Sequence, residues 1–287
     1  MHKPFVFGRR TGSIPGRMRG CHCFVIAVAV FLLAGGRSFS WPAWQSNVSK
    51  EAPGDFPPPR ALHATYVFGW AGITAATADI RFSRISQDRF QLQGVGRTTG
   101  FARALWRYDV NLTAVANAST LRPIETTQAE TARSKKVTTH LVFSNNGVSR
   151  ARTEGPGAGT TKTKEFNFPN LYDLHSAMLY LRSQPLTEKS VRRVVVYPAT
   201  SAYLATATVA GREKISTRAG SYDAIKLDLQ LKRVGKDLDL QPHRKFRRGT
   251  IWISDDPDRL ILRIEAQIFV GTIFAELYSV HFNDVKP

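Results

Sequence analysis

Three polar side chains of the kind used in hydrolytic chemistry stand together in the middle of the chain. Asp173, His175 and Ser176 have the residue types of an orienting acid, a base and a nucleophile. On a helix, Asp173 and Ser176 share one side while His175 points elsewhere, and adjacent residues cannot form the relayed geometry of a catalytic triad. The sequence also lacks a G-x-S-x-G elbow. We therefore expect structural roles, as a helix cap and as hydrogen-bond partners of a sheet.

Three aspartates around a proline form the second polar group. Asp255, Asp256 and Asp258 could act as an acid and base pair, or as oxygen ligands for calcium. Aspartates beside a proline are also common in hairpin turns, because their carboxylates accept hydrogen bonds from nearby backbone amides. We favour the turn, with Arg259 as the charge partner of these carboxylates.

The sequence gives little support to metal or thiol chemistry. Both cysteines, Cys21 and Cys23, precede an apolar run that is expected to leave with an export signal. The histidines after that run occur singly, without the H-x-H or H-E-x-x-H spacing of a zinc site, at His63, His140, His175, His243 and His281. We expect no metal, cofactor, disulfide or cysteine nucleophile.

The first 40 residues have the composition of a signal peptide. Basic residues precede an unbroken apolar run, residues 24–34, which is only about half as long as a bilayer-spanning helix. Small residues at Ser38 and Ser40 then suit a cleavage site near Ser40. We predict a periplasmic protein whose residues 1–40 are the signal peptide, with the true start at either Met1 or Met18.

A large excess of positive charge narrows the choice of partners. The 287 residues include 40 Lys and Arg against 22 Asp and Glu, for a formal net charge of +18. Residues 1–40 hold six of the 40 basic side chains and none of the 22 acidic ones, so the remainder keeps a charge of +12. An exported protein does not meet nucleic acid, so lipid phosphates, lipopolysaccharide and acidic polysaccharide are the expected polyanions, and merely solvated loops are the alternative. The basic clusters are Arg133, Lys135 and Lys136, then Lys162 and Lys164, and finally His243 to Arg248.

One helix is predicted, over residues 170–183. Asn170 is the expected N-cap, Asp173 lies in the first turn, and Pro185 ends the helix because the residue before a proline avoids helical geometry. Apolar residues recur at helical intervals and define a face that a sheet must cover. These residues are Leu171, Leu174, Met178 and Leu181.

The rest of the chain alternates in the two-residue period of β-strands. About twelve strands are predicted, and their short connections indicate antiparallel neighbours. Their ranges are 62–70, 76–82, 90–98, 108–116, 124–130, 137–144, 191–197, 203–209, 224–231, 249–254, 260–270 and 272–282. Residues 154–164 are predicted to be a flexible basic loop. The fold class is all-β, a large curved antiparallel sheet that forms a barrel or half-barrel with one packed helix.

The domain prediction divides the chain into three parts. Residues 1–40 are the signal peptide, and residues 41–60 are a proline-rich linker. Residues 61–287 are a β-rich domain, either single or made of two lobes joined near residues 155–170.

Several motifs resemble a bacterial envelope family catalogued as domain of unknown function 3108. The helix Asp173 to Arg182 is similar to its D-x-x-S-A-x-x-Y-x-R segment, and residues 211–215 and 220–227 to its G-x-E-x-I and G-x-Y-x-A-x-K-L segments. Residues 251–256, Arg259-Leu260 and Val270-Gly271 resemble its W-x-S-D-D-x-x-R-L-P hairpin and the following strand, except that Ile261 replaces the usual proline. Weaker matches are residues 66–73 and 121–123. The resemblance spans roughly residues 66–277 and implies an exported β-rich envelope protein, without any catalytic residue.

The predicted function is binding without catalysis. Aromatic and aliphatic stripes usually form a core, but in a half-closed sheet they can also hold a lipid chain. They are Tyr66, Phe68 and Trp70, and Leu260, Leu262 and Ile264. We expect a ligand that is a lipid, glycolipid or anionic polysaccharide. A structural adaptor that contacts envelope proteins is the alternative, and an enzyme using Asp255 or Asp256 comes third. The candidate ligand-binding residues are Asp173, Ser176, Tyr180, Arg182, Trp252, Asp255, Asp256 and Arg259.

Overall fold

The computed structural model describes residues 43–48, 52–155 and 159–283. The predicted signal peptide, both cysteines and the cleavage site near Ser40 lie outside these residues. The described chain forms 15 strands in one mainly antiparallel sheet, together with a few short helices. The predicted fold class is therefore confirmed.

Eight strands form the amino-terminal part of the sheet. They are β1 (Leu62–Trp70), β2 (Ile73–Ser86), β3 (Arg89–Thr98), β4 (Tyr108–Asn117), β5 (Pro123–Ala132), β6 (Lys135–Ser144), β7 (Gly147–Glu154) and β8 (Thr160–Asn167). The later strands are β9 (Val191–Val196), β10 (Ala202–Thr217), β11 (Gly220–Val234), β12 (Leu240–Pro242), β13 (Phe246–Ser254), β14 (Ile261–Ile268) and β15 (Gly271–Phe282). The helices are η1 (Ala43–Asn47), α1 (Gly100–Leu105) and α2 (Leu174–Ser183). Of these described helices, none is long and apolar enough to cross a membrane.

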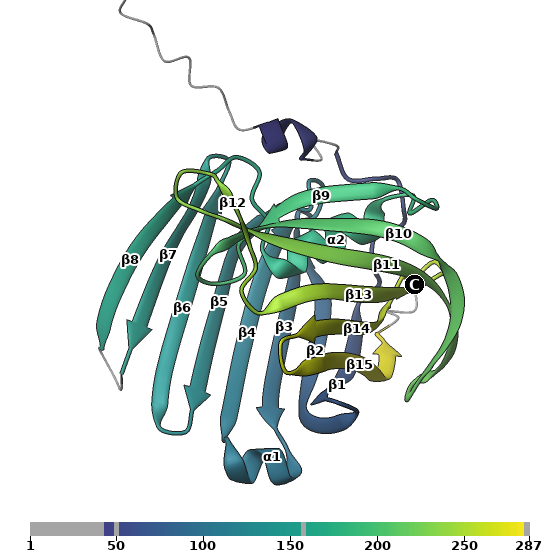
Figure 1. Ribbon diagram of the computed structural model, residues 1–287, viewed down its shortest axis with the longest axis horizontal. Coiled ribbons are helices and arrows are strands. Elements are labelled where there is room, and N and C mark those ends of the chain that lie inside the picture. Colours follow the sequence, from purple (N-terminus) through teal and green to yellow (C-terminus); the bar gives the residue numbers. More distant parts are fainter. Residues whose placement is uncertain (1–42, 49–51, 156–158, 284–287) are drawn as a thin grey trace, which may run out of the picture. The chain divides into compact units, whose positions relative to one another are not determined.

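Hydrogen bonds connect the strands in the order β8-β7-β6-β5-β4-β3-β2-β1-β15-β14-β13-β11-β10-β9, with β12 paired to β11. Figure 1 shows β1 to β8 side by side as one wall, β9 to β11 with β13 to β15 as the other, and α2 between the two walls. Along the described chain, β8 and β9 are the two ends of this path, so the sheet curls around α2 without closing through strand pairing.

The two walls meet away from α1 through side-chain packing. Leu141 of β6 and Val148 of β7 pack in one buried cluster with Val195 of β9 and Leu204 of β10. Trp44 joins this cluster from η1, where it stacks on Phe168 with ring centroids 5.6 Å apart. Burial of such large apolar side chains contributes about 1.5–3 kcal/mol each, which holds the two walls together at this end.

The start of α2 differs from the prediction. The N-cap is Asp173, not Asn170, and Asp173 forms a capping box with Ser176. Asn170 has a φ of 59°, outside the helical region, and Tyr172 exchanges backbone hydrogen bonds with the β9 segment at Val195 and Tyr197. Because Tyr172 is held to β9, residues 171–173 cannot join the helix.

The buried surface of α2 is also broader than one stripe. Leu179 packs on Phe82 and Phe90 of the first wall, whereas Leu181 packs on the β10, β11 and β13 strands of the second. The predicted face was wrong at Leu174, which is 63% exposed. A helix between two walls needs apolar side chains in two directions, so a single apolar stripe is a poor guide to its burial.

The predicted loop over residues 154–164 was also wrong. Strands β7 and β8 form a hairpin there, with Arg152 opposite Lys162 and Glu154 opposite Thr160. Basic residues occupy one face of this hairpin and mainly Thr, Ser and Ala the other, so the usual apolar signal of a strand is weak. Together with the short β12, which was also not predicted, these two strands bring the sheet to 15 strands instead of about twelve.

We predict that the Asp173→Ala substitution lowers the free energy of unfolding by about 2–3 kcal/mol, through loss of the cap and of buried hydrogen bonds. Urea unfolding followed by circular dichroism measures this change. Leu174→Ala is the matched control, since the adjacent side chain is exposed, and it should stay within about 0.5 kcal/mol of the parent. Equal effects of the two substitutions would contradict the role given to the cap.

Candidate functional site

The structure separates the predicted site residues into three places. Asp173 and Ser176 lie at the start of α2, with Tyr180 one turn further along. Arg182, Asp256 and Arg259 meet at the end of α2. Trp252 lies apart from both groups, and the side chain of Asp255 pairs with Arg212 beside the turn. The predicted residues do not form a single site.

The start of α2 is a closed network of buried hydrogen bonds. Both the backbone N–H and the hydroxyl of Ser176 donate to Asp173 Oδ1, each over 2.6 Å. Thr126 of β5 donates its hydroxyl to Asp173 Oδ2, also over 2.6 Å. Tyr180 is 1% exposed and its ring lies 5.3 Å from that of Tyr172. These side chains satisfy one another, which confirms the structural role predicted for Asp173 and Ser176.

Two arginines join the end of α2 to the turn before β14. Arg182 donates to the backbone carbonyl of Asp258 over 2.8 Å, and Arg259 donates back to the carbonyl of Arg182 over 2.6 Å. Arg259 also donates to the carbonyl of Gln184, so it satisfies carbonyl groups left free at the helix end. Burial and the neighbouring Arg259 lower the pKa of Arg182 to about 10, and Arg182 therefore stays charged near neutral pH.

The aspartates around the turn have partners other than those predicted. Asp256 Oδ1 accepts hydrogen bonds from the hydroxyl of Ser254 and the backbone N–H groups of Asp258 and Arg259, at 2.8–3.0 Å. The turn interpretation is thus confirmed for Asp256. The guanidinium of Arg259 turns towards α2 and forms none of the described ion pairs, so the prediction fails as a direct contact; burial lowers the pKa of Arg259, and the charge of Asp255 partly opposes that shift. Asp258 instead pairs with Arg60, and Asp255 with Arg212, each at 2.7 Å.

The proline-rich segment at residues 52–60 packs on the same helix end. Gly54 N–H donates to Ser183 Oγ over 3.1 Å, and the ring of Phe56 lies 3.3 Å from the guanidinium carbon of Arg259. A Cβ atom on Gly54 would lie 2.1 Å from the Ser183 carbonyl oxygen, so only glycine allows this approach. A cleft of about 240 Å³ lies between this segment, Phe90 and α2.

Trp252 faces the β10–β11 hairpin. Its indole N–H donates to Glu213 over 2.7 Å, and the Lys226 ammonium lies 5.6 Å from its ring centroid. The hydrogen bond from Trp252, together with Lys226, lowers the pKa of the Glu213 carboxyl. Trp252 therefore has a packing role with its polar group satisfied.

A more open surface lies on the inner face of the sheet, the face against which α2 packs. Phe90 on β3 touches α2, and alternation along β3 brings Leu92, Gly94 and Gly96 to the same face. Gly94 pairs with Leu112 of β4. Beyond α2, Leu92 and Leu112 are only half-buried. The residues that flank each of them along its strand are polar and point to the outer face. Beyond α2, which packs on Phe82 and Phe90, this apolar wall of β2 to β4 has no helix over it in the part of the chain that the structure describes.

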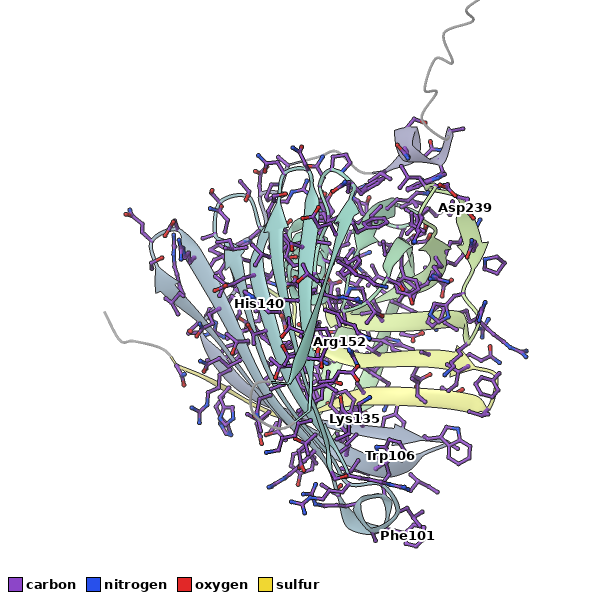
Figure 2. The ribbon with its side chains drawn as sticks, turned by 90° about the vertical axis from the view of Figure 1, so that its left-hand side faces the viewer. Phe101, Trp106, Lys135, His140, Arg152 and Asp239 are labelled. Atoms are coloured by element: carbon purple, nitrogen blue, oxygen red, sulfur yellow. The ribbon has the colours of Figure 1, made fainter. Side chains whose placement is uncertain are left out.

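The inner face becomes basic on β7 and β8. Strand pairing carries the inner face from Thr126 on β5 to Leu141 and then to Arg150 on β7. Arg152 follows on the same face, opposite Lys162. The side chains of Arg152, Glu154, Thr160 and Lys162 line a hollow of about 270 Å³. Figure 2 shows Arg152 and Lys135 in this part of the sheet. Lys135 and Arg152 both pair with Glu154 at 2.9 Å, so the basic wall keeps an excess of positive charge.

His175 lies in the first turn of α2. Its ring centroid lies 5.8 Å from that of Phe82, and its Nε2 atom is enclosed without a hydrogen-bond partner. Burial lowers the pKa of His175 to about 4, an effect that the nearby Asp173 carboxylate partly opposes. His175 is thus neutral near pH 7, and it does not contact Ser176 Oγ in the way a general base would.

The sequence analysis did not identify the inner-face residues of β3 and β7. The glycines of β3 had no apolar side chain to attract attention, and β7 was not predicted at all. The alternation of Val110 and Leu112 with Asn111 was a usable signal for the apolar wall. Among the described residues, no group of three or more His, Cys, Asp or Glu side chains could hold a metal ion.

Three comparisons relate the chain to known proteins. A family model described as "Protein of unknown function (DUF3108)" matches residues 65–278. No curated protein matches the sequence. A crystal structure of a beta-barrel-like protein of domain of unknown function DUF1849 from Brucella abortus is similar with a TM-score of 0.55 at 10% identity, covering 80% of this chain and 100% of that one. This likeness concerns the fold alone.

Two further structures match less well. A candidate lipoprotein from Parabacteroides distasonis gives a TM-score of 0.34 at 10% identity, covering 81% of this chain and 100% of that one. A candidate exported protein with a YmcC-like fold from Bacteroides fragilis gives 0.32 at 8% identity, covering 80% and 99%.

We predict that Arg259→Lys lowers the free energy of unfolding by about 1–3 kcal/mol, because one ammonium group cannot serve several helix carbonyls in the way a planar guanidinium does. Guanidinium chloride unfolding measures the change. Arg212→Lys is the control, since its pair with Asp255 is on the surface, and should cost under about 0.5 kcal/mol. A neutral result for Arg259→Lys would show that the helix end does not depend on this contact.

The His175 pKa predicts loss of stability in acid. The unfolded chain binds the proton near pH 6.5, whereas the folded protein resists it down to about 4. Stability should therefore fall as the pH drops through this window, by on the order of 2–3 kcal/mol. Urea unfolding at pH 7 and pH 4.5 should show a smaller fall for His175→Gln than for the parent and for the exposed control His140→Gln. An equal fall in all three proteins would refute the assignment.

Proposed function

We propose that this chain, which belongs to the DUF3108 family of proteins of unknown function, is a non-enzymatic binding protein. Its ligand would be an amphiphile with an anionic head group. The observation that supports this best is the inner face of the sheet, where apolar positions on β2 to β4 and basic positions on β7 and β8 stand on either side of the polar β5 positions Gln128 and Glu130. Lipids and glycolipids combine the same two properties. The export signal predicted over residues 1–40 supports a periplasmic location.

The apolar wall suits an acyl chain. Ile80, Leu92, Val110 and Leu112 lie around Gly94 and Gly96, and this whole group remains partly accessible except Gly96. Glycines remove side-chain bulk, so another apolar group can approach the backbone there. A Cβ atom on Gly94 would meet only Leu112, at 3.7 Å, which indicates free space above this position.

The basic wall suits a phosphate or carboxylate. Arg152 and Lys162 face the 270 Å³ hollow, and Lys164 and the buried Arg150 follow on the same face of the sheet. Glu154 compensates only part of this charge. Charged donors beside an apolar surface orient an amphiphile, because the chain leaves water while the head group keeps polar partners.

Binding without catalysis accounts better for the polar residues than an enzyme does. Asp173, Ser176, Asp256 and Arg259 are engaged with the helix or the turn. His175 is neutral and has no contact with a nucleophile among the described side chains. A general base must reach the proton that it removes, and this arrangement does not provide that contact.

We predict that Gly94→Phe, which adds a ring to the apolar wall, lowers lipid binding by about tenfold or more. The protein is purified from envelopes in mild detergent, stripped of detergent, and analysed by native mass spectrometry for lipid adducts. Phosphatidylglycerol is then offered from vesicles to the delipidated protein and uptake is measured.

Val95→Phe is the matched control, because Val95 follows Gly94 in β3 and is 55% exposed on the outer face. Both variants must keep the parent's circular dichroism and unfolding midpoint. Equal uptake by Gly94→Phe and the parent, or no lipid on the parent in either assay, would refute the proposal. A protein partner recovered in place of lipid would favour the adaptor alternative.

A further inference from the structure

Exposed apolar side chains gather at one end of the sheet. Nine of the fourteen large hydrophobic residues that are exposed in the described chain lie at or beside the connections of that end. We call them the apolar tip. They are Phe68, Trp70 and Ile73 at the β1–β2 turn, Phe101, Leu105 and Trp106 at α1, and Phe269, Val270 and Ile273 at the β14–β15 turn. Figure 2 shows Phe101 and Trp106 at α1, at the lower end of the molecule.

Backbone contacts hold the three parts of the apolar tip together. Trp70 donates its indole N–H to the carbonyl of Val270 over 2.9 Å, and Trp70 pairs with Ile273 in the sheet. Thr99, the N-cap of α1, donates its N–H to the carbonyl of Ala75 in β2, also over 2.9 Å. The tip is therefore one surface built from neighbouring connections.

Several side chains of the apolar tip are largely exposed to solvent. Phe101 is 79% exposed, Ile73 68% and Phe269 62%. Single exposed apolar side chains are normal, but a contiguous group marks a surface that contacts another apolar phase or molecule. Other exposed apolar residues, Ile85, Val95 and Val142, are isolated on the outer face or at the opposite end of the strands.

Positive charge borders the apolar tip on its α1 side. The guanidinium carbon of Arg133 lies 5.2 Å from the ring centroid of Trp106, and Lys135 and Lys136 follow at the start of β6. Arg107 lies next to Trp106, and only Asp109 partly compensates it, at 3.6 Å. Aromatic residues interleaved with Arg and Lys are typical of proteins that insert shallowly into an anionic bilayer surface, whereas the core of a protein interface is depleted in lysine.

We propose that the apolar tip docks the protein on an anionic lipid bilayer. Phe101, Leu105 and Trp106 enter the boundary between head groups and acyl chains, and Arg107 and Arg133 contact lipid phosphates. The apolar tip lies apart from the inner face. The docking proposal therefore does not depend on the proposed binding of a lipid by the inner face.

The test is co-sedimentation of the full-length expressed protein, in whatever processed form it is exported, with vesicles of phosphatidylcholine that contain or lack phosphatidylglycerol. The triple variant Phe101→Ser, Leu105→Ser, Trp106→Ser should lose binding by about tenfold or more, since it removes three exposed apolar side chains from the contact. The double variant Arg107→Gln, Arg133→Gln should weaken binding only to vesicles with phosphatidylglycerol. This loss of binding should be smaller at high salt, where the charges are screened in the parent as well.

The matched control is Ile85→Ser, Val142→Ser, which removes exposed apolar side chains outside the tip and should bind like the parent. Intact mass confirms that all proteins share the same N-terminus, because an uncleaved apolar run at residues 24–34 would itself bind vesicles. Unchanged binding by the triple variant overturns the proposal. The proposal is also overturned if the parent protein binds neither vesicle type but forms a dimer that the triple variant abolishes. The tip would then be an interface between copies of the chain.

Discussion

The structure depends on satisfying both ends of one short buried helix. Every helix leaves four N–H groups and four carbonyls without partners inside the helix, and burial makes each of them costly. At the start of α2, Asp173 and Ser176 provide the missing partners, and Thr126 connects them to β5. At its end, Arg182 and Arg259 exchange hydrogen bonds between the helix and the turn before β14. The helix thereby links both walls of a sheet that does not close through hydrogen bonds.

The short length of α2 determines what the inner face can do. Ten residues fill the space between the walls only near the end closed by packing of Leu141 and Val195. Beyond the helix, the inner side chains of β2 to β4 keep an apolar character without full burial. A core position that is apolar but accessible is a natural contact for an apolar ligand. The same packing that stabilises the fold therefore leaves the surface on which the proposed function rests.

The distribution of charge separates structural arginines from those available to ligands. Arg182 and Arg259 donate hydrogen bonds to backbone carbonyls, and the aspartates nearby pair with Arg60 and Arg212. Other basic side chains lie on strands and turns near α1, on β7 and β8, and from Arg244 to Arg248 at the start of β13. Positive charge in these places can attract lipid phosphates over the Debye length of about 8 Å. The proposed binding of an anionic amphiphile relies on this second group of basic side chains.

Local patterns were enough to predict much of this protein. The strand alternation, the single main helix and the family resemblance all come from residues close in sequence, because strand and helix periods depend on neighbours. Only the tertiary structure decided that α2 begins after Asp173, that Arg259 serves helix carbonyls, and that the aromatic residues of α1 are exposed. Periodicity shows which side chains share a face, but packing between distant segments decides what covers that face.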